Sequence, residues 1–260
     1  MNKNLNLLYF SATETTAKII KSVASGFNKK SKEYNITLPV NRTSTLNFKE
    51  DDIVIIGAPV YAGRVPDFLS NYFTQIRGNN TYAVFIVVYG NRAYEDALLE
   101  MKDIFEANGF IGIAGGAFVG EHSYTAKLAT GRPDAKDLSI AYKFGTDINE
   151  KLKTVNPLLH KLTVKGNYPY RKGMEYEPVM IDTDESCINC GICSEHCPMG
   201  AINMSNKKDI DISRCIRCCS CIKRCPLNAK DINHELHKKF LQEFTSTYSA
   251  VRQEPELFIV

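Results

Sequence analysis

The stretch LLYFSATETTAKII, residues 7–20, decides how the first part of the chain folds. An apolar run typical of a buried strand ends in six small hydroxylic and acidic residues (SATETT, 11–16), and a helical pattern follows. A strand that enters a helix through a short loop predicts a βαβ unit. The loop has two interpretations: it binds a phosphate at the helix N-terminus, or it only caps the helix through Thr13 or Thr15.

Apolar runs of the same kind recur along the first half of the chain and alternate with helical patterns. They predict strands at 4–10, 34–40, 52–57, 82–89 and 111–119. Helices are expected over about 14–28, 66–77, 93–108 and 134–153. This alternation favours an α/β fold, here a doubly wound five-stranded parallel sheet with helices on both faces. Such sheets bind ligands beyond the carboxyl ends of their strands, where the SATETT loop would lie.

Composition and charge argue against several other classes of protein. The chain has 260 residues and a formal net charge of +3. No window approaches about 18 consecutive apolar residues, the length of a membrane span. The N-terminal residues enter a strand pattern without the apolar core and cleavage site of a secretory leader. We therefore expect a cytoplasmic protein that spans no membrane and binds no nucleic acid.

All nine cysteines lie in an internal repeat between Cys187 and Cys225. An offset of 28 residues superimposes CINCGICSEHCPMGA (187–201) on CIRCCSCIKRCPLNA (215–229). Each copy reads C-x₂-C-x₂-C-x₃-C-P, a spacing that holds 4Fe-4S clusters, with the fourth cysteine of each copy ligating the other cluster. This pattern assigns one cluster to Cys187, Cys190, Cys193 and Cys225, and the other to Cys215, Cys218, Cys221 and Cys197.

Zinc is the alternative interpretation of these cysteines, because C-x₂-C pairs also bind zinc. Zinc sites, however, usually place about a dozen or more residues between their two pairs and lack a third cysteine in step. Cys219, the ninth cysteine, aligns with Gly191 in the repeat and is expected to be a spare, buried thiol. The segment 178–232 resembles a bacterial-type two-cluster ferredoxin, which implies a small α+β domain and single-electron transfer at low potential.

Two further loops, GAPVYAGRVP (57–66) and VYGNRAYEDA (88–97), follow the third and fourth strands. Each places tyrosines among small residues, which suits a flat aromatic ring, although a single tyrosine is more often ordinary packing. With SATETT they resemble the hydroxyl-rich phosphate loop, the G-x-P-x-Y loop and the Y-G loop of flavodoxins, over about residues 4–155. The resemblance implies a flavodoxin-like fold and bound FMN, with Glu14 where that family usually has glycine. It implies FMN contacts from Ser11, Thr13, Glu14, Thr15, Thr16, Ala58, Pro59, Val60, Tyr61, Ala62, Gly63, Tyr89, Gly90, Asn91, Arg92 and Tyr94.

The whole chain is similar to the flavodoxin/ferredoxin fusion proteins of anaerobic bacteria and archaea. We expect a flavodoxin-like FMN-binding domain (1–160), a connector (161–179), a ferredoxin-like domain with two 4Fe-4S clusters (180–232), and a C-terminal helix and tail packed on the body (233–260). Apolar residues recur near helical spacing over 232–251. This stripe predicts core packing against the large domain, with a partner-binding helix as the alternative.

The two cofactors together favour an electron carrier between a low-potential donor and a partner redox protein, because FMN exchanges electrons singly or in pairs and a 4Fe-4S cluster singly. No catalytic residue is assigned. One alternative is a reductase that uses FMN to reduce a quinone, nitro compound or free flavin, and another is a redox sensor. The segment GEHSYTAKLATGRPD (120–134) follows the fifth strand. We expect it near the flavin edge, either as a solvated connecting loop or as a substrate-binding lid, and a buried pocket there would favour the reductase.

Overall fold

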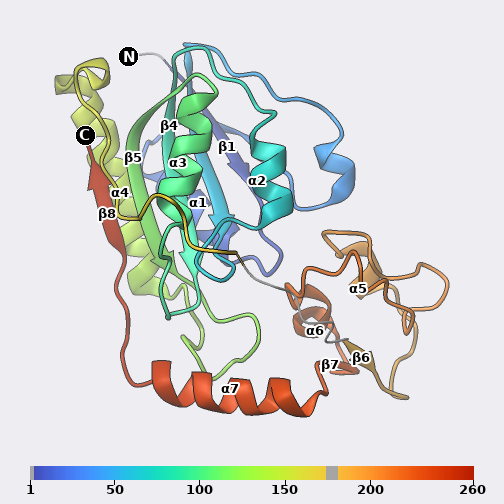
Figure 1. Cartoon of the computed structure of the whole chain (residues 1–260). Coiled ribbons are helices and arrows are strands. Elements are labelled where there is room, and N and C mark those ends of the chain that lie inside the picture. The colour runs from blue at the N-terminus through green and yellow to red at the C-terminus, as the bar shows by residue number, and fades with distance from the viewer. Residues whose placement is uncertain (1–2, 174–180) are drawn as a thin grey trace.

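The computed structural model describes residues 3–173 and 181–260, and its larger part is built around a six-stranded sheet (Figure 1). The strands are β1 Asn4–Tyr9, β2 Ser31–Asn35, β3 Asp52–Pro59, β4 Thr81–Tyr89, β5 Phe110–Val119 and β8 Glu256–Ile259. Their order is β2-β1-β3-β4-β5-β8. The first five pair in parallel and β8 joins β5 antiparallel. The α/β fold with a doubly wound, mostly parallel sheet is therefore confirmed.

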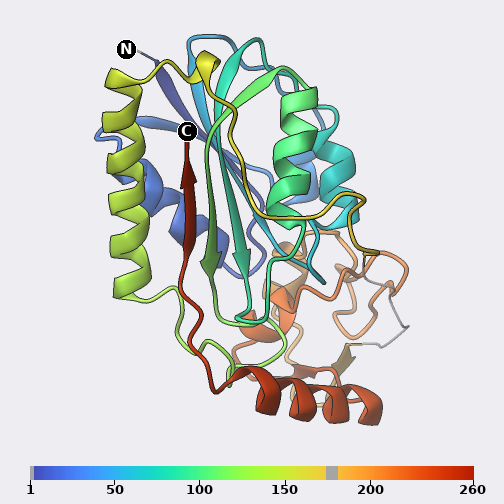
Figure 2. The same ribbon diagram turned by 60° about the vertical axis from the view of Figure 1, so that its left-hand side comes forward.

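Helices cover both faces of the sheet, as the alternating pattern predicts (Figure 2). One face carries α1 (Thr15–Ser25) and α4 (Ala135–Thr154), and the other carries α2 (Asp67–Phe73) and α3 (Ala97–Ala107). Two short 3₁₀ helices, η1 and η2, lie in the connections at Pro39–Arg42 and Pro157–Leu159. Among the described residues, no helix is both long and apolar enough to cross a lipid bilayer.

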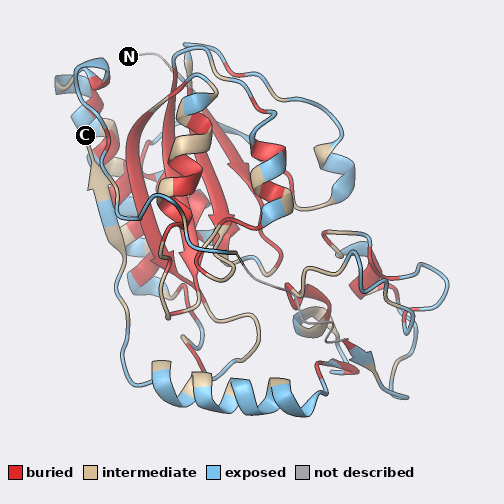
Figure 3. Cartoon of the chain, viewed as in Figure 1, coloured by how far each residue is buried: buried red, intermediate tan, exposed pale blue. Residues whose placement is uncertain are grey.

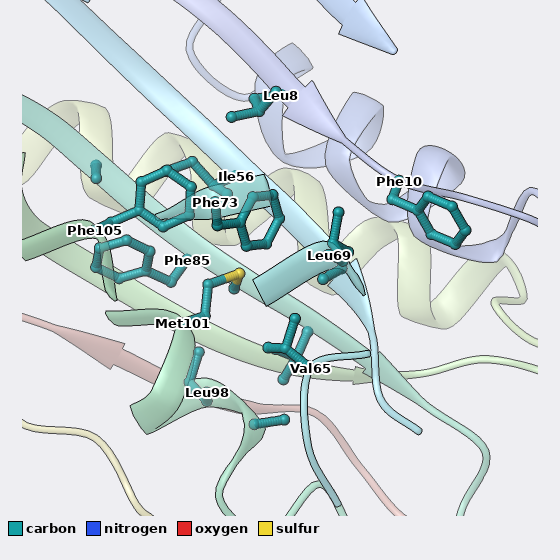
Figure 4. Packing of buried hydrophobic residues seen from close by; sticks show 14 of the residues in the cluster. Leu8, Phe10, Ile56, Val65, Leu69, Phe73, Phe85, Leu98, Met101 and Phe105 are labelled. Atoms are coloured by element: carbon teal, nitrogen blue, oxygen red, sulfur yellow. The ribbon is translucent and has the colours of Figure 1, made fainter. Parts of the chain in front are cut away.

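The core fills the two layers between the sheet and its helices, where buried residues gather (Figure 3). Every residue of β4 is buried, which is the pattern of a parallel strand covered on both faces. On the α2–α3 side the rings of Phe73, Phe85 and Phe105 pack together, with 4.9 Å between the centroids of Phe73 and Phe105 (Figure 4). This packing fixes the strand ends, and so it fixes the loops that follow them.

The smaller part of the chain lies beside the carboxyl ends of the parallel strands (Figure 1). It contains β6 Asp182–Thr183, α5 Ile192–Glu195, α6 Ser220–Arg224 and β7 Lys230–Asp231, and β6 pairs with β7 antiparallel. The backbone repeats along with the sequence. Asn189 and Gly191 have φ values of 56° and 90°, and their counterparts Arg217 and Cys219 have 51° and 58°.

The last helix, α7 (Glu235–Tyr248), crosses below the carboxyl ends of the sheet before the chain turns back as β8 (Figures 1 and 2). None of its residues is buried, so the prediction that the apolar stripe packs into the core is wrong for this helix. The helix lies on loops rather than on the sheet, so Leu236 and Phe240 remain largely exposed. The second strand also differs, since it occupies 31–35 instead of 34–40.

Candidate functional site

A pocket opens at the carboxyl ends of β1, β3, β4 and β5, where the loops that follow these strands meet, and we call it the sheet-end pocket. Its empty volume is about 460 Å³. It lies where a doubly wound sheet is expected to bind a ligand. The predicted FMN-binding residues that line it are Thr13, Thr15, Thr16, Pro59, Val60, Tyr61, Tyr89 and Gly90.

The loop after β1 brings the N-terminus of α1 to this pocket. Thr13, Thr15 and Thr16 line the pocket, and the first amides of a helix have no partner within the helix and attract anions. Ser11 is buried and lies outside the lining. Its Oγ accepts a hydrogen bond from the Ala17 N–H at 3.1 Å, and this contact fixes the loop. The threonine hydroxyls and the helix end fit the phosphate of FMN.

Glu14 takes the left-handed conformation that a glycine adopts more easily. Its φ is 66° and it forms the N-cap of α1, at a cost of about 1–2 kcal/mol for a residue with a Cβ. Its side chain is not part of the pocket lining and pairs with Arg224 on α6. The loop therefore keeps its geometry without glycine, and the carboxylate is held by a cation of the smaller domain.

Three further predicted residues, at the end of β3 and on the loop after it, also lie outside the lining. Ala58 is fully buried in β3. Ala62 and Gly63 form a turn with φ values of 50° and 83°. The turn is closed by backbone hydrogen bonds of 2.9 and 3.1 Å between Tyr61 and Arg64. These residues shape the loop, and the pocket takes its surface from Tyr61 itself.

Asn91 holds the C-terminal tail instead of lining the pocket. Its Nδ2 donates to the carbonyl oxygens of Tyr248 and Val251, both at 2.8 Å. Its Oδ1 accepts from the Gln253 N–H at 3.1 Å. The buried amide is thus fully engaged with the segment between α7 and β8.

Arg92 and Tyr94 are likewise engaged outside the pocket. Arg92 makes a bidentate ion pair with Glu95, in which its Nη1 and Nη2 lie 2.9 and 3.0 Å from the two carboxylate oxygens. Tyr94 is buried, and its hydroxyl donates to Glu256 at 3.0 Å. Burial and this hydrogen bond raise the pKa of Tyr94 well above its ordinary value. The sequence pattern does not distinguish a tyrosine beside a ligand from one packed in the core.

The rest of the lining consists of Ala12, Val88, Gly120, Glu121, His122 and Ser123. The last four begin the segment 120–134, which was expected beside this site, whereas Ala12 and Val88 were not among the predicted contacts. His122 packs against Gly90 so closely that a Cβ there would lie 2.3 Å from its Cδ2. Its ring centroid is 5.1 Å from that of Phe244 on α7. Burial, with Lys223 and Arg92 nearby, lowers the pKa of His122 to about 4, so the ring is neutral at pH 7. The position of 120–134 after the fifth strand predicted that this segment lies here, and its residues 120–123 line the pocket.

The cysteines line two separate pockets in the smaller domain, each with an empty volume of about 340 Å³. We call the pocket further from the large domain the remote pocket, and the one beside that domain the near pocket. The remote pocket is lined by three cysteines from the first run and one from the second: Cys187, Cys190, Cys193 and Cys225. The near pocket is lined by three from the second run and one from the first: Cys215, Cys218, Cys221 and Cys197. The spare thiol, Cys219, is buried and also lines the near pocket.

The donor sets fit cubane clusters better than single zinc ions. Four thiolates around one zinc lie about 2.3 Å from a common centre. Among the described residues, no three His, Cys, Asp or Glu side chains converge in this way. Ligands spread over the corners of an iron cube lie further apart. Burial raises the pKa of Cys221 to about 12 and raises that of Cys218 well above its ordinary value, so ionised thiolates at these positions require a bound metal cation beside them.

The near pocket adjoins the large domain, and the remote pocket faces solvent. Cys218 belongs to the hydrophobic core that contains Phe85, and Ile216 packs against that core. At the other end, Ile188 and Leu227 of the remote pocket are 68% and 46% exposed.

Polar contacts add to this join between the domains. Lys223 on α6 pairs with Glu121 at 2.5 Å, and Glu121 lines the sheet-end pocket. Arg42 donates to the carbonyl oxygen of Pro198 at 2.6 Å. With the Glu14–Arg224 pair, these contacts place the near pocket beside the sheet-end pocket.

Comparisons with known proteins agree with both halves of this arrangement. A family model described as a flavodoxin domain matches residues 6–118, and one described as a 4Fe-4S dicluster domain matches residues 179–226. No curated protein matches the sequence.

Solved structures resemble the larger part of the chain. A flavodoxin from the domain Archaea is 13% identical, with 58% of this chain and 99% of that chain covered and a TM-score of 0.41. A Fusobacterium nucleatum flavodoxin bound to flavin mononucleotide is 14% identical, with 58% and 97% covered and a TM-score of 0.38. Megasphaera elsdenii flavodoxin is 13% identical, with 56% and 98% covered and a TM-score of 0.37.

The chain therefore has a flavodoxin-like α/β fold followed by a ferredoxin-like iron-sulfur region. With a flavodoxin domain and a 4Fe-4S dicluster domain in one polypeptide, it matches a flavodoxin/ferredoxin fusion. The two domains support an FMN and iron-sulfur electron-transfer protein.

Proposed function

We propose that this protein passes electrons between FMN in the sheet-end pocket and two 4Fe-4S clusters in the near and remote pockets, and on to a partner redox protein. The observation that carries the proposal is the adjacency of these pockets. Residues of α6 contact two loops at the sheet-end pocket, and Cys221 on the same helix lines the near pocket. Electron transfer requires centres that are held close together, and this arrangement supplies that condition.

The chain's own residues have distinct tasks in this scheme. The threonines at the start of α1 bind the phosphate, and Tyr61 and Tyr89 offer aromatic surface to a flat ring. Eight cysteine thiolates hold the clusters, with the fourth ligand of each run reaching across to the other site. When bound, FMN supplies one- and two-electron chemistry and each cluster supplies one-electron chemistry.

The first test is the cofactor content of anaerobically purified protein. Acid-released flavin, iron and acid-labile sulfide are measured per chain. The proposal expects about one FMN with about eight iron and eight sulfide, as two cubanes require. Iron without flavin, even after FMN is added, would contradict the flavin half, and flavin without iron would contradict the cluster half.

A reductase is the second candidate, and His122 is the observation that favours it. Its Nδ1 accepts the Tyr124 N–H at 3.2 Å, so the neutral ring carries its proton on Nε2, beside a partly covered pocket. Such a group can hydrogen-bond a small acceptor. Reduction of a quinone or nitro compound that saturates with substrate, and falls tenfold in His122→Phe with FMN still bound, would favour the reductase. A rate that does not saturate with substrate, and that is the same in the wild type and in His122→Phe, would favour the carrier.

A further inference from the structure

The near and remote pockets share one backbone repeat but differ in the side chains around their cysteines. The described residues that line the near pocket include no charged side chain, and its walls are largely isoleucine, with Ile181, Ile202, Ile210 and Ile216. The remote pocket is lined by two lysines, Lys207 and Lys230. The difference lies outside the cysteine pattern, which is identical in the two copies.

Both lysines are buried cations. Lys207 is 5% exposed and Lys230 is 3% exposed. The Nζ of Lys230 donates to the Thr183 hydroxyl and to the Lys207 carbonyl oxygen, both at 2.7 Å, and the Nζ of Lys207 donates to the Met204 carbonyl oxygen.

These hydrogen-bond partners are neutral oxygens, and within 3–173 and 181–260 neither lysine forms an ion pair with a carboxylate. A buried cation without a counter-ion is strongly unfavourable, because burial removes its hydration. The thiolates of the remote pocket are anionic groups that can compensate this charge. The two lysines are therefore explained if the pocket holds a negatively charged centre.

Cluster potential depends on this local charge. Reduction of a 4Fe-4S cluster adds one negative charge, and a nearby cation in a region of low dielectric stabilises the reduced form. The near pocket has no lysine or arginine in its wall, and cations act on its cysteines only from outside the lining, as Lys230 does on Cys221 and Arg217 on Cys215. The remote pocket has two lysines in the wall itself, so its cluster should receive more of this help. Two clusters with the same four-cysteine ligation should then differ in potential because of their surroundings.

We propose that Lys207 and Lys230 raise the reduction potential of the cluster in the remote pocket above that of the cluster in the near pocket, so that electrons from the flavin side collect at the remote pocket. This inference rests on the proposed function. Each electron gained by the remote cluster is one lost by the reduced flavin, through the near cluster. The exposed rim of the remote pocket then makes it the exit toward a partner.

The test is a redox titration of the holoprotein, followed by electron paramagnetic resonance of the reduced clusters, with Lys230→Met and Lys207→Met. In each variant we expect the remote cluster's ratio of reduced to oxidised form at fixed potential to fall about tenfold, which is 59 mV for a one-electron couple. The near cluster should shift less. Lys230→Arg keeps the charge and should keep the potential. Lys208→Met is the matched control, because Lys208 pairs with Glu185 outside the pocket lining.

The signals are assigned by ligand loss. In wild type the higher-potential signal should be the one that disappears in Cys187→Ala, and its disappearance in Cys215→Ala instead would overturn the proposal. Unchanged potentials in both lysine variants, with iron and sulfide content intact, would also overturn it. If Lys230→Met fails to assemble the remote cluster, the potential of that cluster in Lys207→Met tests the proposal instead. A wild type without clusters would refute the proposed function itself, which is a separate result.

Discussion

Position 14 shows how one residue can depart from a family pattern and keep the local structure. Glu14 holds the left-handed backbone that a glycine would take, and its carboxylate reaches Arg224 of the other domain. A carboxylate at the start of this helix would repel a phosphate dianion if it pointed into the pocket. The structure avoids this repulsion by giving the charge a partner outside the sheet-end pocket.

This arrangement predicts that Arg224 supports FMN binding through Glu14. Arg224→Ala should raise the dissociation constant of FMN by about two- to fivefold, because an exposed ion pair contributes up to about 1 kcal/mol. In a Glu14→Gly background the same change should have no effect. Flavin fluorescence during titration of the flavin-free protein measures both constants. The control is Arg214→Ala, since Arg214 donates to the Met199 carbonyl oxygen within its own domain. Equal losses in both backgrounds would refute the coupling.

The crossed cysteine arrangement gives a second prediction at single residues. Cys197→Ser should damage the cluster in the near pocket and leave the other largely intact, and Cys225→Ser should do the reverse. Electron paramagnetic resonance with iron analysis of each variant measures this. Cys219→Ser, which removes the ninth thiol, should retain both clusters. Loss of the remote cluster in Cys197→Ser would show that the pairing is wrong.

At the scale of elements, the buried strands were predictable and the exposed ones were not. The runs for β1, β3 and β4 stand out because both faces of these strands are buried. β2 reads SKEYN and is mostly exposed at the sheet edge, so it carries no apolar pattern, and its predicted position was shifted. β8 was missed because its partner, β5, lies far away in sequence, although the apolar residues at 257–260 were a signal.

The tail depends on Asn91, and this gives a prediction for β8. Asn91→Ala removes three partly buried hydrogen bonds to the segment before β8, worth about 2–3 kcal/mol together. The amides of β8 should then exchange with solvent about 30-fold faster or more, which hydrogen exchange measures. Asn149→Ala is the control, because it removes one long bond of 3.5 Å to Phe27. Unchanged exchange in Asn91→Ala would show that strand pairing alone holds the tail.

At the scale of the whole molecule, sequence spacing predicted the cysteine sets but not the join between the domains. A repeat of C-x₂-C-x₂-C-x₃-C carries its own geometry, because three ligands on one short loop leave a corner for a distant fourth. The contacts of α6 with the large domain have no such local signature. Lys223 and Arg224 look like ordinary surface cations until Glu121 and Glu14 are placed opposite them.

These two ion pairs predict that electron transfer between the flavin and the near cluster depends on charge. Replacing both cations, Lys223→Gln with Arg224→Gln, should slow that transfer about fivefold, because the domains spend less time docked. Rising salt should slow the wild type toward the same rate, since partly exposed pairs are screened. Flash reduction of the flavin, with absorbance followed at flavin and cluster wavelengths, measures the rate.

Lys238→Gln is the matched control, because it breaks a pair with Glu235 on α7 without touching α6. A rate that responds to neither the double substitution nor salt would mean that the apolar contact of Ile216 and Cys218 with the core, with the Arg42–Pro198 hydrogen bond, is enough to hold the domains. In that case the charges on α6 would have no part in docking. A rate that falls in the double substitution but not in Lys238→Gln assigns the alignment of flavin and cluster to the two ion pairs of α6.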